Sequence, residues 1–94
     1  MTEATSTAAK ATPITVHVLF FSVLRERVGR GEIDVSIGSG ACASQLLDEL
    51  SRVYPAVDAF RGITRIAVNQ IYVDEFVELT EGDEVALITP VSGG

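Results

Sequence analysis

Few residues of this chain could do chemistry, and the most suggestive are the last two, Gly93 and Gly94. Glycine has no side chain, so a Gly-Gly end is the thinnest peptide available and can enter a narrow channel of another protein. A free α-carboxylate is ionised at neutral pH, with a pKa near about 3.5, and is therefore inert. Activation by AMP would supply a leaving group, and sulfide transfer would then give a thiocarboxylate, which is a soft nucleophile. The two glycines alone are equally compatible with a plain flexible end.

Other reactive side chains are isolated. The only histidine, His17, lies in an apolar stretch without a serine or cysteine motif beside it, which favours a structural role. The only cysteine, Cys42, precedes a predicted helix, where a thiol pKa can fall, but a small filler at a turn is the simpler interpretation. The acidic residues between 74 and 84 do not match an EF-hand loop. The sequence therefore predicts no metal site and no bound cofactor.

The charge of the chain argues against two classes of partner. The formal net charge is −6, and the arginines are scattered along the sequence. With no basic patch to neutralise phosphates, the chain is not expected to bind nucleic acid or an anionic membrane. The acidic residues gather late in the chain, at Asp74, Glu75, Glu78, Glu81, Asp83 and Glu84. They form either a solvated loop or an acidic surface that steers the domain toward a basic partner.

The length of 94 residues is that of a single domain. We expect a disordered leader at 1–13, a folded domain at 14–90 and a flexible tail at 91–94. No apolar run resembles a signal peptide or approaches the roughly 18 residues of a membrane span, and one cysteine allows no intrachain disulfide. These features suit a cytoplasmic protein.

Hydrophobic patterning predicts the elements that position the tail. Alternating or β-branched stretches indicate strands at 15–21, 32–37, 65–69, 71–73 and 84–90. A short helix at 23–28, with Ser22 as N-cap and Gly29 as its left-handed end, should follow the first strand. The longest helix is expected at 43–54, because leucines recur on one face, Cys42 and Gln45 resemble a capping box, and Pro55 ends it.

The first and last predicted strands are apolar on both faces, whereas the second and third are apolar on one. Strands buried on both faces lie in the middle of a sheet, so the two terminal strands should be central and parallel. With a right-handed crossover through one main helix, this arrangement is an α+β fold of the β-grasp type, with a mixed sheet covered on one face.

One helix can cover only one face of the predicted sheet, so nothing is yet assigned to cover the other face. Leu19, Phe21, Ala86 and Ile88 are candidates for an apolar surface on that side, and such a surface usually binds another protein. The alternative is that the short helix and the segment 73–79 cover it.

The chain resembles the small, sulfur-carrying subunits of molybdopterin synthase, a ubiquitin-like family, from about residue 16 to residue 94. The matching segments are VLFFSVLRERVG at 18–29, LLDELSRVYP at 46–55, AVNQIYVD at 67–74 and EGDEVALITPVSGG at 81–94, of which the last is the most specific. Two departures are modest. Thr89 stands where many members have proline, and Cys42 replaces a capping threonine.

The resemblance implies a role for the tail. Gly94 would be adenylated and then thiocarboxylated, and the residues threaded into the partner would be Gly93, Ser92, Val91 and Pro90. The sulfur would go to cyclic pyranopterin monophosphate, forming the dithiolene of molybdopterin. The same resemblance places Phe20, Phe21, Leu19 and Ile88 at the partner surface, without deciding which phenylalanine makes the contact.

The resemblance also implies the partners. They are a large catalytic subunit, in a heterotetramer, an E1-like adenylyltransferase that uses ATP, and a sulfurtransferase or cysteine desulfurase. Two alternatives stay open: a sulfur carrier for thiamine, cysteine or tRNA thiolation, and a ubiquitin-like protein modifier. A plain interaction module, in which the tail has no role, is a further possibility of another class.

Overall fold

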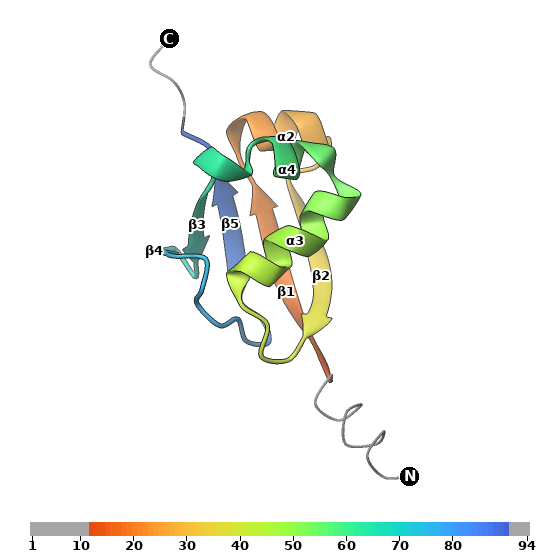
Figure 1. Cartoon of the computed structure of the whole chain (residues 1–94), viewed down its shortest axis with the longest axis vertical. Helices are drawn as coiled ribbons and strands as arrows, with labels where there is room; N and C mark the ends of the chain where they lie inside the picture. Colours follow the sequence, from red (N-terminus) through yellow and green to blue (C-terminus); the bar gives the residue numbers. More distant parts are fainter. Residues whose placement is uncertain (1–11, 91–94) are drawn as a thin grey trace.

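The computed structural model of the chain describes residues 12–90, which form one mixed sheet with helices packed on one side (Figure 1). The elements in chain order are β1 (Pro13–Phe20), α2 (Ser22–Val28), β2 (Glu32–Gly38), α3 (Ala43–Val53), α4 (Pro55–Ala59), the 3-10 helix η1 (Arg61–Ile63), β3 (Arg65–Val68), β4 (Ile71–Val73) and β5 (Glu84–Ile88). None of these helices is long and apolar enough to cross a membrane.

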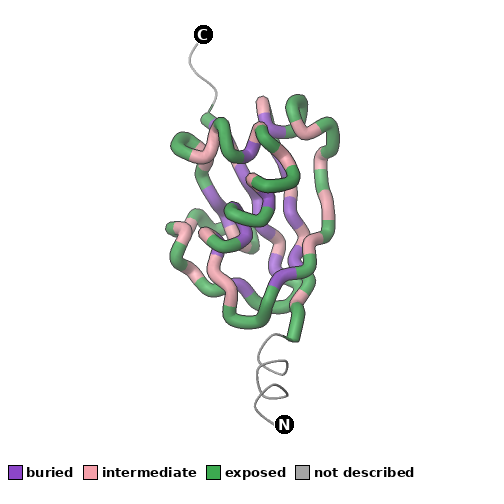
Figure 2. Tube along the Cα trace, turned by 45° about the vertical axis from the view of Figure 1, so that its right-hand side comes forward, coloured by how far each residue is buried: buried purple, intermediate pink, exposed green. Residues whose placement is uncertain are grey.

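The strand order is β2-β1-β5-β3-β4, and the two central strands, β1 and β5, are parallel. All other neighbours pair antiparallel. This confirms the predicted β-grasp arrangement. The physical reason is that β1 and β5 carry apolar side chains on both faces, so each gains most burial with a strand on either side. Buried positions accordingly run along the inside of the fold (Figure 2).

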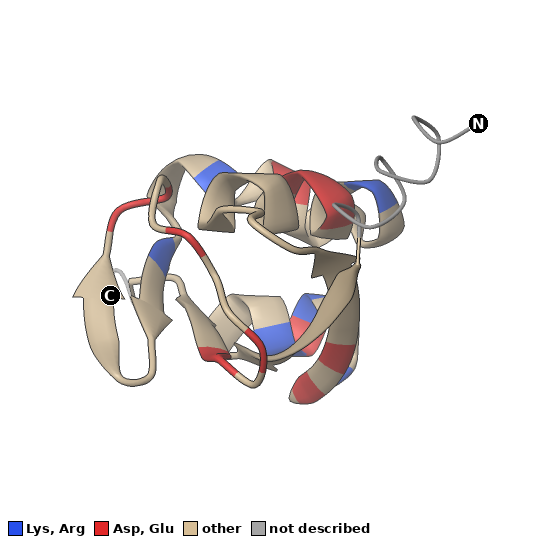
Figure 3. Ribbon diagram, turned by 90° about the horizontal axis from the view of Figure 1, so that it is seen from below, with Lys and Arg blue, Asp and Glu red and all other residues tan. Residues whose placement is uncertain are grey.

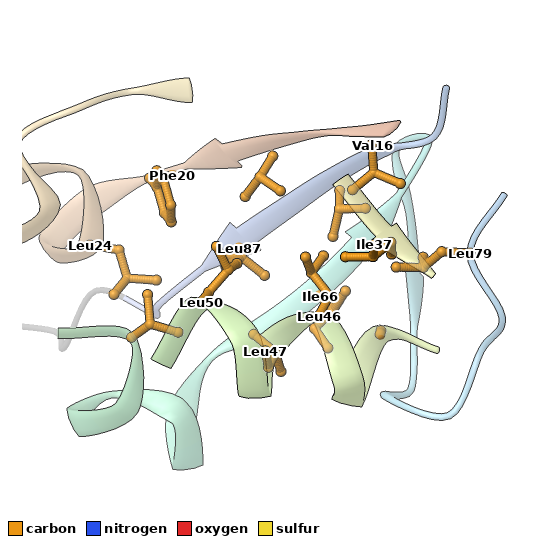
Figure 4. Close-up of a cluster of buried hydrophobic side chains, with 14 residues drawn as sticks. Val16, Phe20, Leu24, Ile37, Leu46, Leu47, Leu50, Ile66, Leu79 and Leu87 are labelled. Atoms are coloured by element: carbon orange, nitrogen blue, oxygen red, sulfur yellow. The ribbon is translucent and has the colours of Figure 1, made fainter. Parts of the chain in front are cut away.

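The core lies between the sheet and α3, as Figure 4 shows. Val16, Val18 and Phe20 of β1 are at most 1% exposed and face Leu46 and Leu50 of α3. Alternation along a strand puts residues two apart on the same face, and helical periodicity puts residues four apart on one side of α3. Leu24 of α2 closes the end of the core that lies nearest the last residues of β1 and β5.

The helix ends agree with prediction in two places and differ in one. Gly29 has φ of 85° at the end of α2, and the Cys42 amide donates to Gln45 Oε1 at 2.9 Å before α3, both as expected. Ser22, however, is not the N-cap of α2. The cap residue is Phe21, whose carbonyl accepts from the Leu24 amide at 3.1 Å, and Ser22 has φ of 53°. Phe21 is extended because its own amide still pairs with the Leu87 carbonyl of β5 at 3.2 Å.

Several strand boundaries also differ from prediction by one or two residues, and two of these differences bear on the domain limits. β1 begins at Pro13, opposite Gly38, so the predicted leader overlaps the sheet by one residue. β5 ends at Ile88 rather than at Pro90, and proline cannot donate a hydrogen bond to a neighbouring strand. Residues 1–11 and 91–94 lie outside the described part of the chain.

The predicted turn before β5 is held by Asp83, a carboxylate that is only 9% exposed. It accepts hydrogen bonds from the Thr80 amide at 2.8 Å, the Thr80 hydroxyl at 3.1 Å and Asn69 Nδ2 at 3.0 Å. Burial by itself would raise the pKa of Asp83, but the three hydrogen bonds together hold that pKa below its ordinary value. The carboxylate form therefore stabilises the fold.

We predict that Asp83→Asn lowers the free energy of unfolding by about 1–3 kcal/mol, because an amide cannot accept all three bonds. The folded pKa lies below the unfolded one, so the contribution is complete above about pH 4 and disappears as the pH falls through the folded value. Urea unfolding at neutral pH measures the loss. Glu26→Gln, which removes the charge of an exposed residue of α2, is the matched control and should change stability little. Equal stability of Asp83→Asn and wild type would contradict the prediction.

Candidate functional site

The face of the sheet opposite α3 carries a row of apolar side chains across four strands. The pairing registers place Leu19 of β1 beside Ala86 of β5, Ala86 beside Ala67 of β3, and Ala67 beside Tyr72 of β4. The two alanines are small and the flanking side chains are large. The result is a shallow depression of about 300 Å³ in the middle of the sheet.

Phe21 and Ile88 extend this depression toward the end of the sheet at which β5 stops. Phe21 is 40% exposed and Ile88 is half-buried. We call the surface formed by Leu19, Phe21, Ala67, Tyr72, Ala86 and Ile88 the open face. Because Ile88 is the last residue of β5, the open face ends close to the point at which the chain continues through Thr89 and Pro90.

Of the four residues predicted for the partner surface, Phe20 does not belong there. It is 1% exposed, and its ring packs edge-to-face on Tyr54 with a centroid separation of 5.8 Å. The strand alternation sends Phe20 to the α3 side together with Val16 and Val18. The prediction for Phe20 is therefore wrong. Leu19, Phe21 and Ile88 do lie together on the open face.

The alternative that other segments cover this face does not hold for residues 12–90. The segment after β4 runs beside the start of α3, where the Val77 carbonyl accepts from the Ala43 amide at 3.0 Å and the Leu79 amide donates to the Ala41 carbonyl at 2.9 Å. Leu79 is buried in the core on that side. α2 borders the end of the open face without crossing it, since Phe21 remains 40% exposed and Tyr72 62%.

Charged groups on the β1–β2 side of the same sheet form a cluster that the sequence interpretation missed. His17 Nδ1 lies 2.6 Å from Asp34 Oδ1, and His17 Nε2 lies 2.8 Å from Glu32 Oε1. The hydrogen bonds to Asp34 and to Glu32 raise the pKa of His17 above 6.5. The available signal was that Glu32 and Asp34 alternate outward on the strand that pairs with His17, but the register needed to align them is not readable from sequence.

We predict that His17 titrates above 6.5 in the folded protein and returns toward that value when its partners are neutralised. A raised folded pKa adds stability that is present below the unfolded pKa and is lost as the pH rises through the folded one. NMR titration of the imidazole resonances in wild type and in the double variant Glu32→Gln, Asp34→Asn measures this. Glu78→Gln, an exposed acid elsewhere in the chain, should leave the titration unchanged. Identical pKa values in wild type and double variant would refute the assignment.

Three of the late acidic residues lie away from the tail, whereas Asp74 and Glu75 follow β4 and line a hollow together with Arg65. Glu81, Asp83 and Glu84 surround the start of β5, whereas Pro90 follows its end. In Figure 3, which views the molecule from the start of β5, acidic residues mark the connecting loops. An acidic surface at this position is at the opposite end of β5 from the tail.

The remaining predicted site residues are placed as follows. Pro90 is exposed, and Gly94, Gly93, Ser92 and Val91 lie outside the described residues. Thr89 is 2% exposed and its hydroxyl has no hydrogen-bond partner within residues 12–90. Cys42 is a half-buried free thiol at the start of α3. Over the described residues, no group of histidine, cysteine and carboxylate side chains could hold a metal ion.

Comparison with known proteins agrees with this architecture. A model of the ThiS family matches residues 18–94. The molybdopterin synthase sulfur carrier subunit of Chlamydomonas reinhardtii is 38% identical over 81 residues, which cover 84% of this chain and 98% of that protein.

Two solved structures are also similar. SAMP1 of Haloferax volcanii superposes with a TM-score of 0.76 at 26% identity, covering 85% of this chain and 99% of that one. A putative molybdopterin converting factor subunit 1 of Pyrococcus furiosus superposes with a TM-score of 0.75 at 27% identity, covering 83% and 99%. The β-grasp sheet with parallel central strands, the open face at the base of a Gly-Gly tail and a family match over most of the sequence lead to one conclusion: the chain belongs to the ThiS family.

Proposed function

We propose that the chain is the sulfur carrier subunit of molybdopterin synthase and that it carries sulfur as a thiocarboxylate on Gly94. The observation that carries this proposal is the 38% identity to a curated sulfur carrier subunit over 98% of that protein's length. The family match reaches residue 94 and so includes both terminal glycines.

The chemistry takes place on the main chain of Gly94. Its carboxylate attacks the α-phosphate of ATP on an activating enzyme, and pyrophosphate leaves. Sulfide, released from the donor protein's persulfide by a thiol reductant, then displaces AMP from the acyl-adenylate and gives the thiocarboxylate. In molybdopterin synthase the sulfur passes to cyclic pyranopterin monophosphate, and water returns the glycyl carbonyl to a carboxylate. None of these steps needs a catalytic side chain of this chain, so the active sites belong to its partners.

The geometry of residues 12–90 suits delivery of a group held at the tail. β5 is central and pairs with a strand on each side, so the end of β5 is held in place by the sheet. Thr89 is buried, and four residues follow Pro90 in the sequence. If extended, they reach at most about 13–14 Å. A partner that docks on the open face can therefore take the tail into an internal site.

The activation of Gly94, its loading with sulfur and the transfer of that sulfur each require a partner protein. The large subunit of molybdopterin synthase receives the tail, and two small subunits complete a heterotetramer. An E1-like adenylyltransferase consumes the ATP, and a sulfurtransferase or cysteine desulfurase supplies the sulfur. We place these reactions in the cytoplasm. Leu19, Phe21 and Ile88 are the docking residues, and Gly93, Ser92, Val91 and Pro90 form the threaded segment.

A second candidate function is covalent protein modification. It is favoured by the structural similarity to SAMP1 of Haloferax volcanii, whose full name is small archaeal modifier protein 1, at a TM-score of 0.76 and 26% identity. In that case Gly94 would be joined to lysine amines instead of receiving sulfur. A sulfur carrier for another pathway would share the thiocarboxylate but not the large subunit.

Mass spectrometry of the intact chain tests the proposal. After co-expression with an E1-like enzyme and a sulfur donor, the C-terminal peptide should gain the mass that separates sulfur from oxygen. Incubation with the large subunit and the pterin precursor should return the original mass and produce molybdopterin. Lysine conjugates without the thiocarboxylate would support the modifier, and a thiocarboxylate that the large subunit does not consume would support another pathway.

A further inference from the structure

The end of the open face nearest the tail carries arginines that have no ion-pair partner within residues 12–90. Arg65 and Arg25 are both exposed, and neither is within ion-pair distance of a carboxylate there. By contrast, Arg52 pairs with Glu49 at 3.2 Å, and Arg61 pairs with Asp48 at 2.6 Å. Arg27 and Arg30 are also without an ion pair within residues 12–90, but Arg25 and Arg65 are the two that contact or line the open face.

Arg65 lies at the β3 side of the tail base. It is the register partner of Ile88, the last residue of β5. Its guanidinium carbon is 5.5 Å from the centroid of the Tyr72 ring, which belongs to the open face. The aromatic ring holds the cation beside the apolar surface without neutralising its charge.

Arg25 lies at the β1 side. It lines a second hollow of about 350 Å³ together with Leu19, Phe21 and Glu32. Glu32 lines the same hollow but does not pair with Arg25, and its Oε1 is hydrogen-bonded to His17 Nε2 at 2.8 Å. Arg25 has no ion pair with Glu32 or with any other carboxylate of residues 12–90.

These charges oppose the net charge of the molecule. The chain carries −6 overall, and Glu81, Asp83 and Glu84 lie around the opposite end of β5. An overall acidic protein is expected to favour basic partners at long range. At the tail base the apolar surface has Arg25 on one side and Arg65 on the other. Glu32 lines the hollow beside Arg25, and Asp74 and Glu75 line the hollow beside Arg65, but none of them is within ion-pair distance of these arginines.

We propose that the protein surface that receives the tail is apolar at its centre and carries acidic side chains at its rim, placed to meet Arg25 and Arg65. This inference rests on the proposed function, because it assigns the surface to the large subunit of molybdopterin synthase. Opposite charges at the rim orient the two surfaces during encounter, and like charges at that distance would repel. The arginines are thus positioning residues for docking and have no part in the chemistry of Gly94.

Charge reversal tests the inference. The affinity of the full chain for the large subunit of the same organism is measured by calorimetry at low and high salt. Arg65→Glu and Arg25→Glu should each weaken binding roughly tenfold at low salt, with a smaller loss at high salt. The matched control is Arg52→Glu, which changes the net charge equally on α3, away from the open face, and should bind like wild type. Unchanged thermal unfolding of all three variants establishes that the fold is intact.

Each other outcome overturns the inference. Wild-type affinity for Arg25→Glu and Arg65→Glu would mean that the rim of the large subunit's surface does not interact with these arginines. Tighter binding would mean that this rim is basic. An equal loss for Arg52→Glu would assign the effect to net charge. If wild type itself does not bind the large subunit, the proposed function falls and this inference falls with it.

Discussion

Deletion of Gly94 is expected to abolish sulfur transfer while the fold and the docking of the chain survive. The deletion moves the terminal carboxylate back by one residue, or roughly 3.3–3.6 Å of extended chain. A displacement of about 1 Å from a productive geometry can cost on the order of 100-fold in rate, so a full residue should leave no measurable turnover. The measurement is molybdopterin formation with the large subunit.

The physical basis for survival of the fold is that residues 12–90 form a closed core among themselves. Their buried apolar cluster runs from Val16 to Leu87. Removal of residues 2–10 is the control for a shortened chain and should leave transfer intact. Unfolding of the Gly94 deletion, or transfer at the wild-type rate, would contradict the expectation.

The neighbouring phenylalanines should give opposite results when each is changed to alanine. Phe20→Ala removes a ring that is 1% exposed and packed against Tyr54, so it should lower the free energy of unfolding by about 3–5 kcal/mol. Phe21→Ala removes a ring that is 40% exposed, so stability should change by less than about 1 kcal/mol. Its loss should instead weaken binding to the large subunit by roughly 30-fold or more, as for an aromatic anchor.

Two measurements separate these effects. Urea unfolding reports the stability of each variant, and calorimetry with the large subunit reports docking at a temperature where both variants are folded. Each variant serves as the control for the other, because the side chain removed is the same. A large loss of stability for Phe21→Ala with normal docking would show that the open face is not the docking surface.

The sequence by itself determined the topology, and the reason is the hydrophobic pattern. TVHVLFF at 15–21 and the residues of 84–90 carry apolar side chains on both faces, which places both strands at the centre. The leucines of α3 and Pro55 after it mark the helix and its end. The Gly-Gly end and its chemistry were also readable, because main-chain chemistry needs no partner side chain from elsewhere in the fold.

Only the tertiary structure decided which residues meet. Alternation puts Phe20 and Phe21 on opposite faces, but it does not say which face α3 covers. The prediction that Ser22 caps α2 was wrong because the Phe21 amide donates to the Leu87 carbonyl of β5, a contact between residues distant in sequence. The His17 cluster depends on the β1–β2 register, and the Asp83 network depends on the approach of Asn69. Local patterns record which side chains are apolar, whereas these contacts arise only when separate elements are brought together.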